Sequence, residues 1–133
     1  MEQVFSAIKK QDAPEIKALF SEKAIREAAN IDEQTVELLS FIKGNPVSWS
    51  RDGSPRTYDS SEDGGYLKRQ LTWFYLETDE QTYSVLLVDY PEDTIDIDNV
   101  GLYTIKIILT EDESKLDGYI EDWIVPGIHI GVT

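Results

Sequence analysis

The sequence predicts a single α+β domain over residues 1–133, with N-terminal helices packed on a curved antiparallel sheet of four to six strands. Two observations support this fold class. Apolar residues recur at helical spacing through about residues 2–43, whereas β-branched and aromatic residues dominate from Tyr66 onward. The predicted strands also follow one another through short connections, whereas a parallel sheet needs helices between its strands. We therefore place the sheet at about 46–130.

The helical part divides at turn and capping residues. Residues 2–11 form a first amphipathic helix, and Asp12 followed by Pro14 begins a second one, because aspartate caps a helix and proline is tolerated in its first turn. A further cap at Ser21 bends this second helix or starts a third. The clearest helix covers 33–43, with Gly44 as its expected stop.

Residues 47–50 alternate like a short strand. The polar stretch 51–65 that follows is predicted to be a loop, either a tolerated insertion or flexible hairpin tip, or a functional flap. Long strands are expected at 66–76, 83–90 and 101–110. The second of these is apolar on both faces, which is typical of a central strand. Residues 119–130 form a last extended segment that Pro126 interrupts, so we expect a strand at the edge of the sheet.

The net charge of −14 is concentrated in the predicted sheet. Residues 1–69 carry ten Lys/Arg against twelve Asp/Glu, whereas residues 70–133 carry two against fourteen. Such a surface repels nucleic-acid phosphates and anionic lipid headgroups, so neither is an expected partner. No apolar run is long enough to insert into a membrane, and the first residues lack the pattern of a signal peptide.

The absence of cysteine excludes disulfides, thiolate catalysis and cysteine-ligated metals. The single histidine, His129, lies between two isoleucines and is expected to face away from the core. One histidine cannot supply the usual ligands of a zinc site, so we expect no metal and no cofactor.

Three stretches of the chain resemble a bacterial domain family of unknown function that occurs largely in lipoproteins and secreted proteins. They are FSAIKKQDAPEIKALFSEKA, LLVDYPEDTIDIDNVGLYTIKII and WIVPGI. The order of elements is also similar to the cone-shaped fold of nuclear transport factor two, within the cystatin-like group. The resemblance implies an exported or cell-envelope setting, although this chain carries no signal segment and no lipid-attachment cysteine.

Catalysis in this fold, where it occurs, uses cavity carboxylates and tyrosines, so an inward aspartate would be the residue to test. Asp89 is the first weak candidate, because it ends an apolar strand beside Tyr90, and Asp122 beside Trp123 is the second. For either residue, the simpler interpretation is a strand-end side chain that faces water or caps a backbone amide.

The acidic run from Glu92 to Gly101 suggests a calcium loop, because Ca²⁺ prefers several oxygen ligands close in sequence. The spacing of an EF-hand fails, since Val100 and Ile107 would occupy ligand positions. We therefore expect a turn in which Asp and Asn side chains bond to their own backbone, with a calcium site of looser geometry as the alternative.

The sequence is rich in aromatic residues, most of which must belong to the core. In a curved sheet some rings line the open end, and we predict a ligand-binding role for Trp73, Tyr75, Tyr103 and Trp123. The favoured function is a non-enzymatic domain that binds a small molecule or a peptide between helices and sheet. An acid/base enzyme, and a structural module that forms a homodimer through the sheet, remain alternatives.

Overall fold

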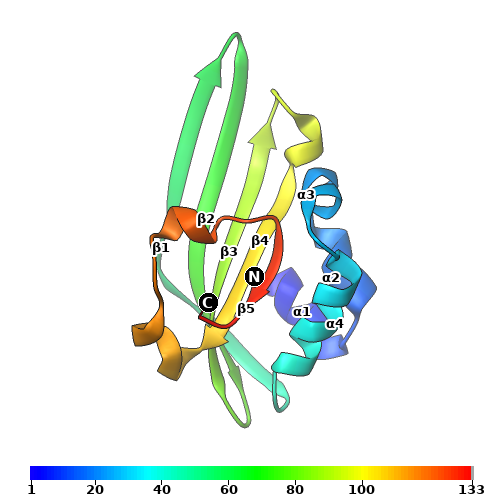
Figure 1. The fold of residues 1–133 in the computed structure, drawn as a ribbon, viewed down its shortest axis with the longest axis vertical. Coiled ribbons are helices and arrows are strands. Elements are labelled where there is room, and N and C mark those ends of the chain that lie inside the picture. The colour runs from blue at the N-terminus through cyan, green and yellow to red at the C-terminus, as the bar shows by residue number, and fades with distance from the viewer. Residues whose placement is uncertain (133) are drawn as a thin grey trace.

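The computed structural model describes residues 1–132 and shows four helices packed on one face of an open five-stranded sheet (Figure 1). The strands follow one another in chain order across the sheet, with three antiparallel pairs and a final parallel pair. The predicted fold class is therefore confirmed, with five strands. The helices are α1 (Glu2–Lys10), α2 (Ala13–Leu19), α3 (Glu22–Glu27) and α4 (Ile31–Phe41), and the strands are β1 (Pro46–Glu62), β2 (Gly65–Thr78), β3 (Thr82–Asp93), β4 (Gly101–Leu109) and β5 (Gly127–Ile130).

Side-chain caps set the starts of three helices. Asp12 accepts a hydrogen bond from the Glu15 amide, and Ser21 accepts one from the Ala24 amide. The predicted caps of α2 and α3 are thus confirmed. The longest helix, α4, begins two residues earlier than predicted, because Asn30 is its cap.

The stretch 51–65, predicted to be a loop or a flexible hairpin tip, is the outer part of a β1–β2 hairpin: most of β1 together with a tight turn. Asp63 and Gly64 both have positive φ, at 49° and 79°, which is the backbone of a two-residue hairpin turn. Gly53 and Pro55 lie in a register shift between Asp52 and Arg56. The polar composition concealed the strand because both faces of this part of β1 are largely exposed. The hairpin extends past the helices (Figure 1).

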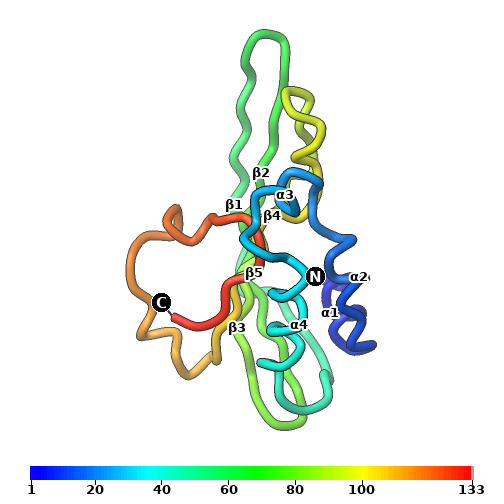
Figure 2. Tube along the Cα trace, turned by 45° about the vertical axis from the view of Figure 1, so that its right-hand side comes forward, coloured from blue at the N-terminus to red at the C-terminus, as the bar shows by residue number. Residues whose placement is uncertain are grey.

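The last segment also differs from the prediction, since only Gly127–Ile130 is a strand. Ile120–Trp123 forms a 3₁₀ turn, and β5 then pairs parallel to β4 at the predicted edge. A parallel return is possible because residues 110–126 cross over the sheet face that the helices leave free (Figure 2).

The core lies between the helices and one face of the sheet, and a smaller cluster lies on the other face. The helices cover Phe74, Val85 and Leu87, whereas Leu71, Leu86 and Val88 pack beneath the C-terminal segment. The central strand β3 is therefore buried on both faces, as its continuous apolar run predicts. In residues 1–132 we find no helix that is long and apolar enough to cross a membrane.

Candidate functional site

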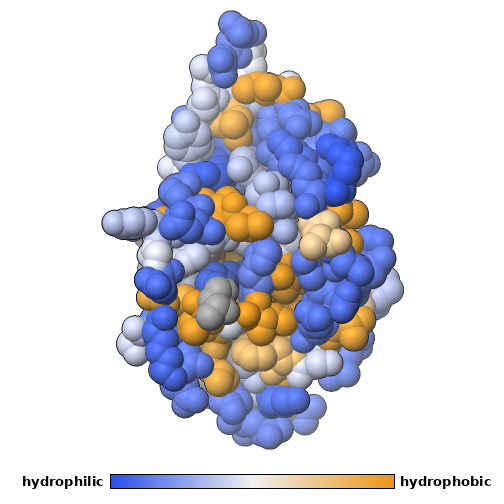
Figure 3. All heavy atoms as spheres, in the orientation of Figure 1, coloured by the Kyte–Doolittle hydropathy of each residue, from blue (hydrophilic) through white to orange (hydrophobic). Residues whose placement is uncertain are grey.

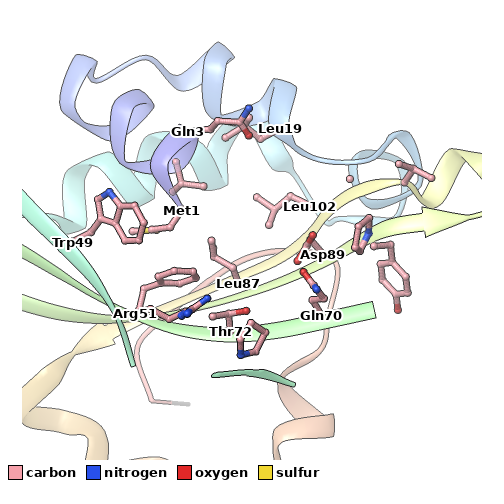
Figure 4. A pocket seen from close by; sticks show the side chains of 17 residues that line it. Met1, Gln3, Leu19, Trp49, Arg51, Gln70, Thr72, Leu87, Asp89 and Leu102 are labelled. Carbon is pink, nitrogen blue, oxygen red and sulfur yellow. The ribbon is translucent and has the colours of Figure 1, made fainter. Parts of the chain in front are cut away.

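A cavity of about 740 Å³ opens between the N-terminal helices and the sheet (Figure 4). Side chains of α1 and α2 lie above it, and side chains of the four antiparallel strands line the rest. Its walls are mainly apolar. Polar side chains in the lining include Gln3, Arg51, Gln70, Thr72 and Asp89.

Strand alternation places these groups on one face. Gln70, Thr72 and Phe74 are two residues apart on β2, so their side chains point to the same side of the sheet. In the register between β2 and β3, Gln70 lies opposite Asp89 and Thr72 lies opposite Leu87. The pairing of β3 with β4 has a register shift between Val88 and Asp89, next to the cavity.

Asp89 is a half-buried carboxylate at the wall of the cavity. Burial raises its pKa, because removal of water disfavours the charged form, and the positive α-amino group of Met1 offsets part of this shift. No hydrogen bond from a described residue contributes to the shift. In Figure 4 the side chains of Asp89 and Gln70 lie close together at one end of the cavity.

The other end of the cavity holds Trp49 and Arg51, both from β1 (Figure 4). The Trp49 ring packs edge-on against Phe74, with ring centroids 5.6 Å apart and an interplanar angle of 72°. Trp49 remains 37 % exposed, so part of this residue is accessible for contact with a bound molecule. The cavity thus has a carboxylate at one end, and an aromatic ring with a guanidinium at the other.

The four aromatic residues predicted to bind a ligand do not line this cavity. Trp73 and Trp123 lie together on the opposite face of the sheet, in edge-to-face contact at 6.2 Å. The Tyr75 hydroxyl donates to Asp52 at 3.1 Å, and Tyr103 packs edge-on against Tyr90 at 5.5 Å. Of the four, Trp73 and Trp123 are in ring contact, and Tyr103 packs against the same small cluster.

The two carboxylate candidates have different surroundings. Asp89 faces the cavity, as described above. The exposed Asp122 accepts a hydrogen bond from the Tyr119 amide at 3.0 Å and so caps a 3₁₀ turn. This is the simpler of the two interpretations that its sequence position allows. His129 is half-exposed on β5, and its Nε2 donates to the carbonyl oxygen of Val125 at 3.1 Å.

In the acidic connection after β3, the Asp93 carboxylate accepts three hydrogen bonds from residues of the same turn. Asp93 is buried and accepts hydrogen bonds from the Ile95 and Asp96 amides at 3.0 and 2.7 Å, and from the Asn99 side chain at 3.1 Å. The predicted turn of self-bonded side chains is thereby confirmed. Among residues 1–132, no group of three or more acidic or histidine side chains is arranged to hold a metal ion.

Sequence reasoning missed Gln70, Thr72, Trp49 and Arg51 as cavity residues. Alternation along β2 and β3 contains the signal for the first two, because they share a face with Asp89 once the register is known. Arg51 was placed in a loop, so its position opposite β2 could not be anticipated.

The chain matches a known family model over most of its length. The profile of a domain of unknown function, DUF5104, matches residues 3–111. This range contains α1 to α4, β1 to β4 and the cavity between them. A search of curated proteins found no match to the chain.

Proposed function

Because the chain belongs to the DUF5104 family, whose function is not assigned, we propose a function from the cavity: it binds a small amphipathic molecule with a positively charged or hydrogen-bond-donating head group. The protein acts in this proposal as a binder rather than as an enzyme. The observation that carries it is the position of Asp89, a carboxylate at the wall of a mainly apolar cavity.

The electrostatics of Asp89 favour an ammonium head group. Burial raises the pKa of this carboxyl, so its charged form lacks the solvation it would have in water. A bound cation would supply the missing favourable charge and hydrogen bonds. The net charge of −14 adds a field that attracts cations to the protein.

The size and lining of the cavity favour an apolar body on the ligand. Small-molecule sites commonly occupy about 300–1,000 Å³ and present apolar walls with a few polar groups, and the cavity of about 740 Å³ falls in this range. Val4, Leu87 and Leu102 would contact the apolar part, while Trp49 and Arg51 would border its far end. A short peptide with a basic side chain fits the same description.

A second candidate function is acid/base catalysis by Asp89. It rests on the raised pKa of Asp89 and on Tyr90, which also lines the cavity. Binding and catalysis can be distinguished by experiment. An enzyme converts its ligand and loses turnover in Asp89→Asn, whereas a binding protein leaves the ligand intact.

The test uses three probes with the same tail and different head groups: octylamine, octanol and octanoate. A ligand that binds only the native state raises the melting temperature. We expect octylamine to raise it most, octanol less and octanoate not at all. Asp89→Asn should abolish the preference for the amine.

Glu37→Gln is the matched control, because it removes the same charge from an exposed position on α4. This variant should keep the preference for octylamine. Equal effects of octylamine on all three proteins would show binding to the general negative surface and would contradict the proposal. If no probe shifts the melting temperature, a structural or homodimer-forming role through the sheet becomes the better account.

The setting of the domain is also part of this proposal. The resemblance to lipoprotein and secreted domains supports an exported protein that meets its ligand outside the cytoplasm. A cone-shaped fold of the nuclear transport factor two type would agree with a cavity between helices and curved sheet.

A further inference from the structure

A buried lysine lies on the sheet face opposite the cavity described above. Lys106 is on β4, is only 4 % exposed, and lies opposite Leu86 of β3. Its Nζ donates to the carbonyl oxygen of Gly131 at 3.1 Å and lies 5.8 Å from the centre of the Trp123 ring. None of the ion pairs within residues 1–132 includes this lysine.

Lys106 borders a second, smaller cavity of about 280 Å³ beneath the C-terminal segment, which also borders Trp123 and His129. Figure 2 shows this segment folded over the sheet on the side away from the helices, and Figure 3 shows apolar side chains exposed around it. Lys106 therefore borders a partly apolar recess whose volume is large enough for a small molecule.

The carboxylates of this recess are engaged with backbone amides. Asp117 accepts from the Gly118 amide at 2.9 Å, and Asp122 accepts from the Tyr119 amide. Burial lowers the pKa of Lys106, because the ammonium ion loses solvating water. A desolvated lysine has more of the neutral amine, which is the nucleophilic form.

His129 can assist a proton transfer at this amine. It is paired with Lys106 across β4 and β5 and borders the same recess. Because its Nε2 donates to the Val125 carbonyl, Nδ1 is the nitrogen without a proton in the neutral ring. The recess thus combines an amine with a proton acceptor.

We propose that Lys106 is a carbonyl-reactive amine that binds a small aldehyde covalently as an imine. The nitrogen lone pair attacks the aldehyde carbon and gives a carbinolamine. His129 accepts the proton that the nitrogen loses and returns it to the hydroxyl group, which leaves as water. The products are one imine and one water, with no change in oxidation state.

The experiment treats the folded protein with propionaldehyde and cyanoborohydride, which reduces the imine to a stable secondary amine, and locates the products by peptide mass spectrometry. We expect Lys106 to react about fivefold or more faster than the exposed Lys9 and Lys43. This preference should disappear in guanidinium chloride, where all lysines are equally exposed.

His129→Gln should slow the reaction at Lys106 several-fold and leave Lys9 unaffected, and Lys106→Arg should remove the fast site. If Lys106 reacts more slowly than the exposed lysines in the folded protein, its hydrogen bond to Gly131 and its contact with Trp123 make it a purely structural residue, and the proposal is wrong. An unchanged rate in His129→Gln would overturn the role given to His129.

Discussion

Asp89 is the residue on which the proposed binding depends, and its pKa has a consequence for stability. The pKa is raised above the ordinary value of 3.8, because burial penalises the carboxylate. Proton binding by Asp89 therefore favours the folded state below the ordinary pKa, and this contribution is lost as the pH rises through the folded-state value. At neutral pH the charged Asp89 reduces stability.

Asp89→Asn should consequently melt a few degrees above the native protein at neutral pH. The difference should shrink as the pH falls below 3.8, where Asp89 becomes protonated and neutral like asparagine. Thermal unfolding of dilute protein at neutral and at acidic pH measures this, with Glu37→Gln as the control. A less stable Asp89→Asn at neutral pH would show that the carboxylate is held by favourable contacts instead.

Asp93 should have the opposite effect, because its buried carboxylate satisfies three donors of the turn after β3. Asp93→Ala leaves these donors without their acceptor and should lower the free energy of unfolding by about 3 kcal/mol. Urea unfolding measures the change. Asp98→Ala, in the same turn but exposed, should change it by less than about 0.5 kcal/mol.

Millimolar Ca²⁺ should leave the melting temperature of the native protein unchanged, because the Asp93 oxygens are already engaged within the turn. A rise with Ca²⁺ that Asp93→Ala abolishes would instead identify this turn as a calcium site.

Among the elements, the N-terminus of α3 is joined to the start of β4 by a backbone hydrogen bond. The Ser21 amide donates to the Leu102 carbonyl at 2.9 Å, and Phe20 forms a bridge with Leu102. Gly101 permits this approach, since a Cβ there would lie 3.1 Å from the Ser21 nitrogen. Its φ of 130° also disfavours other residues.

Gly101→Ala should therefore lower the free energy of unfolding by about 1–3 kcal/mol. Gly53→Ala is the matched control, because Gly53 also has a positive φ but no atom lies within 4 Å of its added Cβ. The difference between the two variants in urea unfolding reports the contact with Ser21 together with the less favourable φ of Gly101. Equal losses would mean that backbone strain alone explains the effect.

Whether an element can be predicted from the sequence depends on how many of its faces are buried. The helices and β2 to β4 have clear apolar periods because each buries at least one face. The outer part of β1 buries neither face, so only Asp63 and Gly64 at the turn indicate a hairpin. The parallel pairing of β5 depends on a long crossover, which no local pattern specifies.

The candidate site was harder to predict than the fold. Asp89 could be selected because a carboxylate at the end of an apolar run is unusual. The four aromatic residues were chosen without knowledge of which sheet face meets the helices, and both faces of β3 are apolar. Their position relative to the cavity therefore required the tertiary structure.

For the whole molecule, the dominant long-range force is the repulsion among excess negative charges. The net charge is −14, and the ion pairs among the described residues are largely exposed. Exposed pairs contribute little, whereas salt screens repulsion over about 10 Å at 0.1 M. Added salt should therefore weaken the repulsion more than it weakens the ion pairs, and so stabilise the protein.

Raising NaCl from about 0.02 M to about 0.5 M should therefore increase the melting temperature by a few degrees. Differential scanning calorimetry at fixed pH measures the change. A decrease with salt would show that the surface ion pairs outweigh the repulsion.

Binding of an amphipathic cation through Asp89 should be visible at the residues of the cavity between the helices and the sheet. The most direct measurement is a titration of ¹⁵N-labelled protein with octylamine, followed by amide chemical shifts. The account predicts saturable changes at Gln70, Thr72, Leu87 and Asp89 that disappear in Asp89→Asn. Changes that are scattered over the acidic surface, or centred on Trp73 and Trp123, would contradict it.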